Sequence, residues 1–221
     1  MKNKKLFIIN TIVLAVLLIV LFFNWQYWEK KKQENNNIPQ VQSVSDGNIK
    51  ITYDKIFGLA VTKDQVPVKS YIPPCDENFD YCFYYNVDNY KGTNFESAGI
   101  RIKKRTDLNS STCLTTPLDG FDPSTKPDAT NASATYSTSV FSNVGQGAAG
   151  HYTSGALYRL YVKEASACYE FETRIGETQF ANYPEGTIKQ FTDNDRNQVK
   201  TQLMSILEGI TLKDGQTLKL P

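Results

Sequence analysis

The stretch Ala156-Leu-Tyr-Arg-Leu-Tyr-Val-Lys163 predicts a β-strand, and so does Ala167-Cys-Tyr-Glu-Phe-Glu-Thr-Arg-Ile175, which begins only three residues later. Both are rich in aromatic and aliphatic residues, and the short connection through Glu164 to Ser166 is typical of a hairpin. Within the second stretch, Tyr169, Phe171, Thr173 and Ile175 would share one face, and Glu170, Glu172 and Arg174 the other. The alternation predicts an antiparallel sheet with one face in the core and one in solvent.

Two other stretches predict strands of the same sheet. In Asn48-Ile-Lys-Ile-Thr-Tyr53 the residues Ile49, Ile51 and Tyr53 fall on one side, and Ser97-Ala-Gly-Ile-Arg-Ile-Lys103 is a further candidate. The stretch from Asp107 to Ser139 is rich in Ser, Thr, Pro, Gly and Asp and has little periodicity. We interpret residues 107–139 as a long loop, which is either functional or mobile.

The hydrophobic period changes near the C-terminus. Thr192, followed three residues later by Asp195, resembles a capping box at the start of a helix. The helix continues with apolar residues at helical spacing and ends at Gly209, where we expect a C′ glycine. These apolar residues are Val199, Leu203, Ile206 and Leu207. Ile210-Thr-Leu212 is a possible short return strand.

The N-terminus carries an apolar run of 18 uncharged residues, Leu6 to Phe23, followed by the aromatic group Trp25-Gln-Tyr-Trp28. A helix of this length covers about 27 Å, close to the ~30 Å hydrocarbon core of a bilayer. A cleaved signal peptide is the alternative, but it needs a shorter apolar core and a small-residue cleavage site, and Asn24-Trp-Gln-Tyr-Trp28 does not resemble one. We therefore expect a transmembrane helix that contacts the membrane through residues 6–23.

These signals together predict an α+β fold class and three segments. Residues 1–28 form the membrane anchor, residues 29–46 a flexible polar linker, and residues 47–221 a single domain. In this domain we expect one antiparallel β-sheet with the C-terminal amphipathic helix packed on its apolar face.

The four cysteines, Cys75, Cys82, Cys113 and Cys168, all follow the apolar run. An even number in an aromatic-rich domain beside a membrane segment indicates two disulfides formed in an oxidising compartment. We prefer the pairing Cys75–Cys82 with Cys113–Cys168, and the two other pairings remain open. Because three lysines lie on each side of the run, the positive-inside rule does not decide orientation. The cysteines place the C-terminal domain outside the cytoplasm, in the periplasm or on the cell surface, and the N-terminus inside.

The charge distribution argues against a nucleic-acid partner. The chain has 24 basic and 23 acidic residues. Residues 1–32 hold six Lys and one Glu, which leaves 18 basic and 22 acidic residues, a net charge of −4, in residues 33–221. Such a domain lacks the basic surface that binds phosphate backbones.

Several motifs suggest chemistry but favour simpler interpretations. Gly145-Gln-Gly-Ala-Ala-Gly150 spells G-x-G-x-x-G, yet no helix pattern follows it, so we interpret it as a glycine-rich turn and expect no cofactor. His151, the only histidine, could serve as a base for Cys113 or a serine, but a structural or exposed role is favoured. Acidic residues cluster at residues 76–88 and 119–128 without the spacing of a calcium loop. The aromatic residues near Tyr81-Cys-Phe-Tyr-Tyr85 either fill the core or form a ligand platform. We assign no catalytic, cofactor-binding or metal-binding residues.

One family resemblance rests on both ends of the domain. Ile56-Phe-Gly-Leu-Ala-Val61 and the closing Gln202-Leu-Met-Ser-Ile-Leu-Glu-Gly-Ile-Thr-Leu212 resemble PsbP-like bacterial envelope proteins. The resemblance implies an antiparallel sheet with a closing helix in the cell envelope. No functional residue carries over, because no position matches a motif residue by residue.

Three functions are compatible with the sequence. We favour a membrane-anchored extracytoplasmic domain with a non-enzymatic role, which binds a protein or an envelope polymer. The second is a subunit of a membrane or secretion assembly that acts partly through its transmembrane helix, where Asn10 and Thr11 could form hydrogen bonds to a partner helix. The third is an envelope hydrolase that uses His151.

Overall fold

A computed structural model of the chain describes residues 22, 24–26, 41–54, 57–60, 75, 79–117 and 124–221. It divides into two compact units, Met1–Gln40 and Val41–Pro221. In the first unit only residue 22 and residues 24–26 are described, and they are helical. The expected anchor therefore lies almost entirely outside the described residues, as does most of the expected linker. Within the described part of the chain, no helix has both the length and the apolar character needed to cross a membrane.

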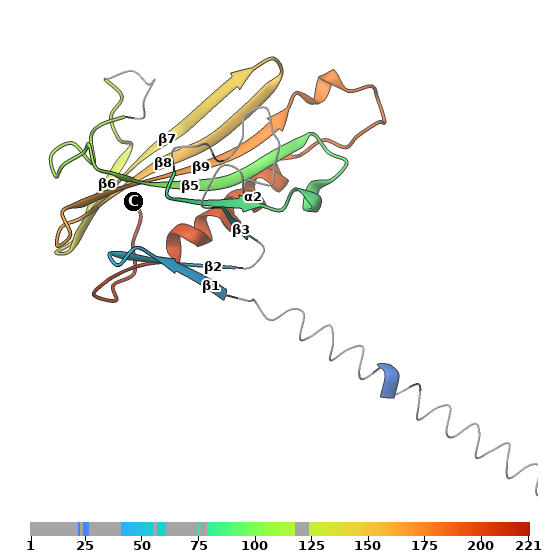
Figure 1. Cartoon of the computed structure of the whole chain (residues 1–221). Coiled ribbons are helices and arrows are strands. Elements are labelled where there is room, and N and C mark those ends of the chain that lie inside the picture. Colours follow the sequence, from blue (N-terminus) through green and yellow to red (C-terminus); the bar gives the residue numbers. More distant parts are fainter. Residues whose placement is uncertain are drawn as a thin grey trace, which may run out of the picture. The chain divides into compact units, whose positions relative to one another are not determined.

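The described residues of the second unit form ten strands in two antiparallel sheets (Figure 1). In the large sheet the order is β3 (Phe57–Ala60), β4 (Tyr81–Tyr85), β5 (Phe95–Arg105), β9 (Ala167–Thr178), β8 (His151–Val162), β7 (Tyr136–Ala148) and β6 (Ala129–Ala132). In the small sheet the order is β1 (Val41–Ser45), β2 (Ile49–Asp54) and β10 (Ile210–Leu212). Among the residues described in this unit, the helical elements are α2 (Asp193–Glu208) and the single 3-10 turns η2 (Val87–Tyr90) and η3 (Phe180–Asn182).

The predicted α+β fold class is therefore wrong. The described part of this unit is mainly antiparallel β-sheet, in two sheets instead of one, with α2 as its one helix longer than a single turn. Strand β1 occupies the end of the expected linker, and β6 and the start of β7 lie in the expected long loop. Strand pairing uses backbone N–H and C=O groups, which every non-proline residue carries, so polar segments of low periodicity can still join a sheet.

Helix α2 lies between the two sheets, in contact with β2 on one side and with β5 and β9 on the other (Figure 1). Its capping box is present as predicted, because the Thr192 hydroxyl accepts from the Asp195 backbone N–H and the Asp195 carboxylate accepts from that of Thr192. All four predicted core residues of the helix are buried, namely Val199, Leu203, Ile206 and Leu207. They join one hydrophobic core with residues of both sheets, such as Ile51 and Phe171.

Gly209 ends the helix for a reason other than the predicted one. Its φ is −79°, so it does not adopt the left-handed conformation of a C′ glycine. A Cβ at this position would lie 2.2 Å from the carbonyl oxygen of Thr52 on β2. Glycine is therefore needed because the helix end and β2 approach closely, and the Thr52 N–H donates to the Gly209 carbonyl at 3.1 Å.

The predicted hairpin is confirmed, and its strands extend further than expected. Strands β8 and β9 pair from Val162–Ala167 to His151–Thr178. The aromatic segment around Tyr81 fills the core: Phe83 is fully buried, and Tyr85, Tyr90, Phe95 and Phe191 pack ring against ring. The buried members of this group, such as Phe83 and Tyr85, therefore stabilise the fold, whereas Tyr81 and Tyr84 are half-buried.

Candidate functional site

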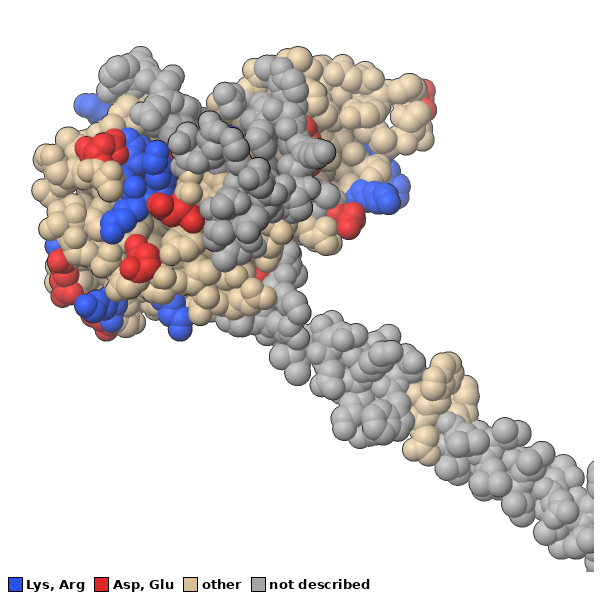
Figure 2. Space-filling view, viewed as in Figure 1, with Lys and Arg blue, Asp and Glu red and all other residues tan. Residues whose placement is uncertain are grey.

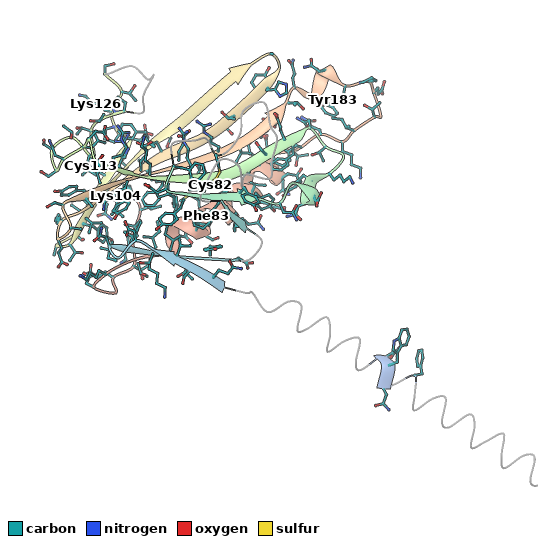
Figure 3. The ribbon with its side chains drawn as sticks, in the orientation of Figure 1. Cys82, Phe83, Lys104, Cys113, Lys126 and Tyr183 are labelled. Atoms are coloured by element: carbon teal, nitrogen blue, oxygen red, sulfur yellow. A yellow bond between two sulfur atoms is a disulfide. The ribbon has the colours of Figure 1, made fainter. Side chains whose placement is uncertain are left out.

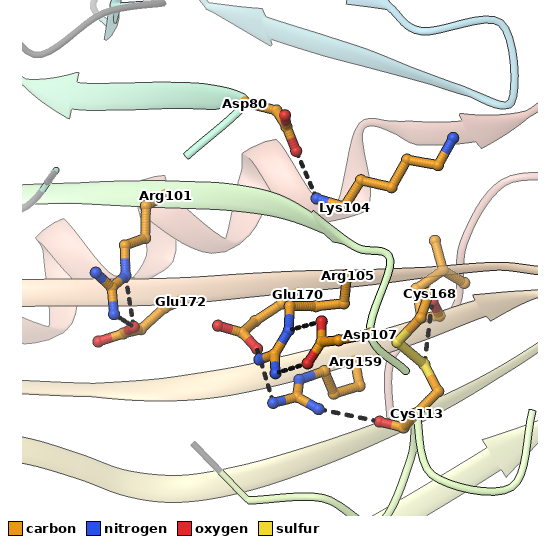
Figure 4. A network of polar contacts seen from close by, with 11 residues as sticks. Asp80, Arg101, Lys104, Arg105, Asp107, Cys113, Arg159, Cys168, Glu170 and Glu172 are labelled. Carbon is orange, nitrogen blue, oxygen red and sulfur yellow. Dashed lines mark hydrogen bonds and ion pairs between the residues drawn. A yellow bond between two sulfur atoms is a disulfide. The ribbon is translucent and has the colours of Figure 1, made fainter. Parts of the chain in front are cut away.

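The second face of the large sheet carries a buried network of charged residues (Figure 4). Glu170, Glu172 and Arg159 are 6%, 1% and 0% exposed, although the alternation in β9 predicted that its charged face points into solvent. The prediction is wrong because arginines from neighbouring strands neutralise these carboxylates. A buried charge is tolerated when it is paired and hydrogen-bonded.

The larger part of this network centres on Glu170. Its Oε2 accepts a 2.6 Å hydrogen bond from Nη1 of Arg105 on β5 and lies 2.7 Å from Nη2 of Arg159 on β8. Arg105 also forms a two-pronged pair with Asp107 at 2.8 and 2.6 Å, which lowers the pKa of Asp107 to about 2. Arg159 donates to the Cys113 carbonyl at 3.2 Å, and its Nε has no hydrogen-bond partner among the described residues.

The smaller part centres on Glu172, which binds Arg101 and Arg174, each through a 2.6 Å hydrogen bond from Nε. Apart from Asp107, which follows β5, these charged groups are held by the strands β5, β8 and β9, and they are largely satisfied by one another. These ion pairs join neighbouring strands and hold their charged side chains in place, so we assign the network a structural role.

Both disulfides are present, in the preferred pairing. Cys113–Cys168 fixes the segment after β5 to the first residues of β9, and Cys75–Cys82 fixes residue 75 to β4. Figure 3 shows Cys113 and Lys104 at the same end of the domain, whereas Tyr183 lies at the other end.

His151 and Cys113 are not brought together. Cys113 is oxidised and bonded to Cys168, near the first residue of β9, whereas His151 pairs with Thr178, the last residue of that strand. The ten intervening residue steps of a β-strand span about 33 Å. Nδ1 of His151 instead lies 2.9 Å from Oε2 of Glu96.

The remaining sequence motifs do not converge on a site. The glycine-rich motif forms the end of β7 and a tight turn at Ala149 and Gly150, both with positive φ, so the predicted turn covers only part of it. Of the acidic clusters, residues 76–78 and 119–122 lie outside the described residues. Among the residues that are described, no group of three or more His, Cys, Asp or Glu could hold a metal ion.

An open hollow of about 200 Å³ lies at the Lys104 end of the domain, between the β1–β2 turn and the large sheet. We call it the Tyr169 hollow, and its lining consists of Asp46, Asp80, Tyr81, Ile102, Lys104 and Tyr169. Figure 2 shows acidic and basic side chains interspersed over this end of the domain. A concave space with a few converging polar groups is the usual form of a ligand site.

The back of the Tyr169 hollow is held rigidly by hydrogen bonds. The Tyr169 hydroxyl donates to Oδ2 of Asp46 at 2.5 Å and accepts from Nδ2 of Asn48 at 3.0 Å. Oδ1 of Asp46 accepts from the backbone N–H groups of Asn48 and Ile49, which forms the β1–β2 turn. Tyr169 is only 1% exposed and its hydroxyl is already hydrogen-bonded on both sides, so this residue forms a fixed wall of the hollow.

These contacts set the protonation states around the hollow. Partial burial is the largest influence on Asp46 and favours its neutral form, but the hydrogen bonds from Tyr169 and the turn outweigh it and lower its pKa. Burial and the Asp46 carboxylate raise the pKa of Tyr169, and burial with the charges of Asp46 and Asp80 raises the pKa of Tyr81. At neutral pH Asp46 is therefore ionised, and the phenols of Tyr169 and Tyr81 are protonated.

The charged groups of Asp80 and Lys104 form no ion pair with each other, although the charge of Lys104 helps to lower the pKa of Asp46. Asp80 accepts a 2.5 Å hydrogen bond from the backbone N–H of Lys104 through Oδ2 (Figure 4). The Lys104 ammonium lies 5.9 Å from the centroid of the Tyr169 ring. Among the described residues, Lys104 forms no ion pair with Asp46 or Asp80. The charged ends of Asp80 and Lys104 are therefore available to a ligand.

A second hollow of about 170 Å³ lies beside the first, between the β8–β9 turn and the segment after β10. We call it the Asp214 hollow, and its lining consists of Asn48, Thr135, Val162, Glu164, Ala165, Leu212, Lys213 and Asp214. Asn48 lines this hollow and donates a hydrogen bond to Tyr169, which lines the first one.

The sequence analysis missed both hollows. Asp46 was assigned to the linker, and Asp80 was considered only as part of a calcium cluster. Asp46-Gly-Asn48 between two strand-like stretches is a turn signal that could have revealed the β1–β2 hairpin. Nothing local relates this turn to Lys104 and Tyr169, which the sheet arrangement alone brings near it. Comparisons with known proteins add no residue roles, because the chain matches no protein-family model and no curated protein.

Proposed function

We propose that this protein is a membrane-attached, extracytoplasmic binding domain of the cell envelope, with a non-enzymatic role, and that it binds an envelope polymer at the Tyr169 hollow. The observation that carries the proposal is the set of exposed charged side chains, above all Asp80 and Lys104, that surround a preformed hollow and form no ion pair with each other among the described residues. The preformed turn at Asp46 means that little ordering entropy is lost when a ligand binds.

The proposed location rests on the cysteines and on the N-terminal sequence. Two disulfides favour an oxidising compartment. The apolar run at residues 6–23 supplies the attachment to the membrane. Alkylation of non-reduced protein in native membranes, followed by mass spectrometry, tests the location. Two intact bridges are expected, and free thiols at all four cysteines would exclude an oxidising compartment.

The binding role is tested with the full chain in detergent and insoluble envelope polymer from the cells that produce it. We expect the protein to sediment with the polymer and the double variant Asp80→Asn, Lys104→Gln to sediment at least about fivefold less, since two charge contacts contribute roughly 1 kcal/mol. Asp88→Asn with Lys189→Gln makes the same charge changes outside both hollows and serves as the control. Equal sedimentation of both double variants, or none by the unmodified chain, would refute the proposal.

A further inference from the structure

One edge of the large sheet is formed by a strand that is only partly paired on its outer side. Strand β6 pairs with Ser137–Val140 of β7, and just beyond it the Asp128 carboxylate accepts from the Ser142 backbone N–H. From Val144 to Ala148, β7 pairs with β8 but with no other strand among the described residues (Figure 1). An uncovered strand edge of this kind is a template for one further strand.

The β7–β8 turn determines which backbone groups of this edge point outward. Both turn residues have positive φ, as in a two-residue hairpin turn, and Ala148 pairs with His151 across it. The pair that flanks such a turn exchanges both of its backbone hydrogen bonds, and bonded and non-bonded pairs then alternate along the two strands. The N–H and C=O groups of Gly145 and Gly147 therefore point away from β8, towards the open side.

The same edge lacks the side chains that normally prevent pairing between copies. Natural edge strands are protected by lysines, other charges or prolines, and residues 129–158 contain no Asp, Glu, Lys, Arg or Pro. Beside the edge, Tyr152 of β8 is 45% exposed, and a Cβ at Gly147 would lie 3.2 Å from its ring. A further strand along β7 would therefore satisfy open backbone groups and also cover an exposed aromatic ring.

We propose that a second copy of this chain occupies the edge, with β7 of one copy antiparallel to β7 of the other about a two-fold axis. Gly145 of each copy lies opposite Gly147 of the other, and each such pair exchanges two backbone hydrogen bonds. Gln146, the centre of the open segment, then lies opposite its own copy, as a two-fold axis requires. The edge is thus its own complement in length and in hydrogen-bond pattern, which favours a second copy over an unrelated strand.

Disulfide cross-linking at position 146 tests this register. The two copies of this position form a non-hydrogen-bonded pair, whose Cα atoms lie about 4.5 Å apart, within the ~4.4–6.8 Å of a disulfide. Gln146→Cys in the full chain, mildly oxidised in detergent, should therefore give a cross-linked dimer. Ser154→Cys, at an exposed position of β8, is the control, because its two copies would lie at least about 14 Å apart. We expect Gln146→Cys to cross-link at least about fivefold more than Ser154→Cys.

Hydrogen exchange on the unmodified chain is a second test, which needs no substitution. The N–H groups of Gly145 and Gly147 are hydrogen-bonded in the pair of copies but not to β8, so their exchange should slow at least about tenfold as the protein concentration rises. Gln146→Lys should abolish this slowing, because it places like charges directly opposite each other. Ser154→Lys adds the same charge away from the edge and should preserve the slowing.

Three results would overturn the inference. The first is equal cross-linking of the two cysteine variants, which would place any contact between copies elsewhere. The second is linkage of Gln146→Cys to a different polypeptide in native membranes. The third is exchange at Gly145 and Gly147 that does not depend on protein concentration. Neither test involves an envelope polymer, so these results leave the proposed function to its own sedimentation experiment.

Discussion

Replacement of Glu170 by Gln should destabilise the domain strongly. The substitution keeps the shape of the side chain but removes the charge that faces Arg105 and Arg159, at 2.6 and 2.7 Å. Arg105 retains Asp107 as a partner, whereas Arg159 is 0% exposed and keeps no other carboxylate among its described contacts. Removal of one partner from a buried ion pair costs about 3–5 kcal/mol.

The expected cost is a large fraction of the ~5–15 kcal/mol by which domains are stable. For a domain of about 180 residues it corresponds to a decrease in Tm of about 6–20 °C. Far-UV circular dichroism under oxidising conditions is a suitable assay. Tryptophan fluorescence is not, because the two tryptophans, Trp25 and Trp28, lie outside the domain.

Two comparisons make this prediction refutable. Glu185→Gln, at an exposed position, should change the free energy of unfolding by less than about 0.5 kcal/mol. The double variant Arg159→Met, Glu170→Leu should be more stable than Glu170→Gln alone, since it removes the buried charge together with its partner. A loss below about 1 kcal/mol in Glu170→Gln would show that Glu170 does not neutralise Arg159.

Three further predictions concern acid stability, a close backbone approach and the wider disulfide. Between pH 4 and 2, the Tm of the Asp107→Asn variant should fall less than the Tm of the unmodified chain. Arg105 lowers the pKa of Asp107 in the folded state from 3.8 to about 2. The ionised Asp107 therefore stabilises the fold above pH 4, and this contribution is lost as the pH falls towards 2. Gly155→Ala should cost about 1–3 kcal/mol or more in urea unfolding, because its Cβ would lie 1.8 Å from the Thr173 carbonyl oxygen. Replacing both cysteines of Cys113–Cys168 by Ser should cost about 4 kcal/mol in the same assay, since the bridge joins positions 55 residues apart.

Each of these predictions has a clear contrary result. If the Tm of Asp107→Asn falls between pH 4 and 2 as much as that of the unmodified chain, another carboxylate controls acid unfolding. Ser154→Ala, at the exposed neighbouring position, is the control for Gly155→Ala, and equal stability of the two would contradict the close approach. If the variant without the Cys113–Cys168 bridge loses less than about 1 kcal/mol in its free energy of unfolding, the bridge does not reduce the conformational entropy of the unfolded chain as expected.

The elements that sequence predicted correctly are those whose signal is local. The β8–β9 hairpin was visible because alternation and a short turn lie within about twenty consecutive residues. Helix α2 was visible because Thr192 and Asp195 cap it and its apolar residues recur at helical spacing. The cysteine pairing agreed with the preferred alternative, although spacing alone left two others open.

The elements that sequence missed depend on partners far away in the chain. Strand β6 is exposed along its whole length and has no apolar alternation, so its pairing with β7 left no periodic signal. The charged face of β9 looked like a solvent face because the arginines that bury it, Arg105 and Arg159, come from other strands. The sequence predicted Gly209 as a C′ glycine because of its position at the helix end, whereas the structure shows that glycine is needed there because the carbonyl of Thr52 lies so close.

The sequence by itself determined the hydrophobic periodicity of the β8–β9 hairpin and of helix α2, the helix cap and the number of cysteines. Each of these can be read from neighbouring residues. Only the tertiary structure decided that the described residues form two sheets, that the charged residues Arg159, Glu170 and Glu172 on the second face of the large sheet are buried, and that two hollows form at one end. Asp46, Asp80 and Tyr169 meet there although 34 and 89 residues separate them in turn. Such a meeting depends on strand order and register, which arise from the packing of the whole domain.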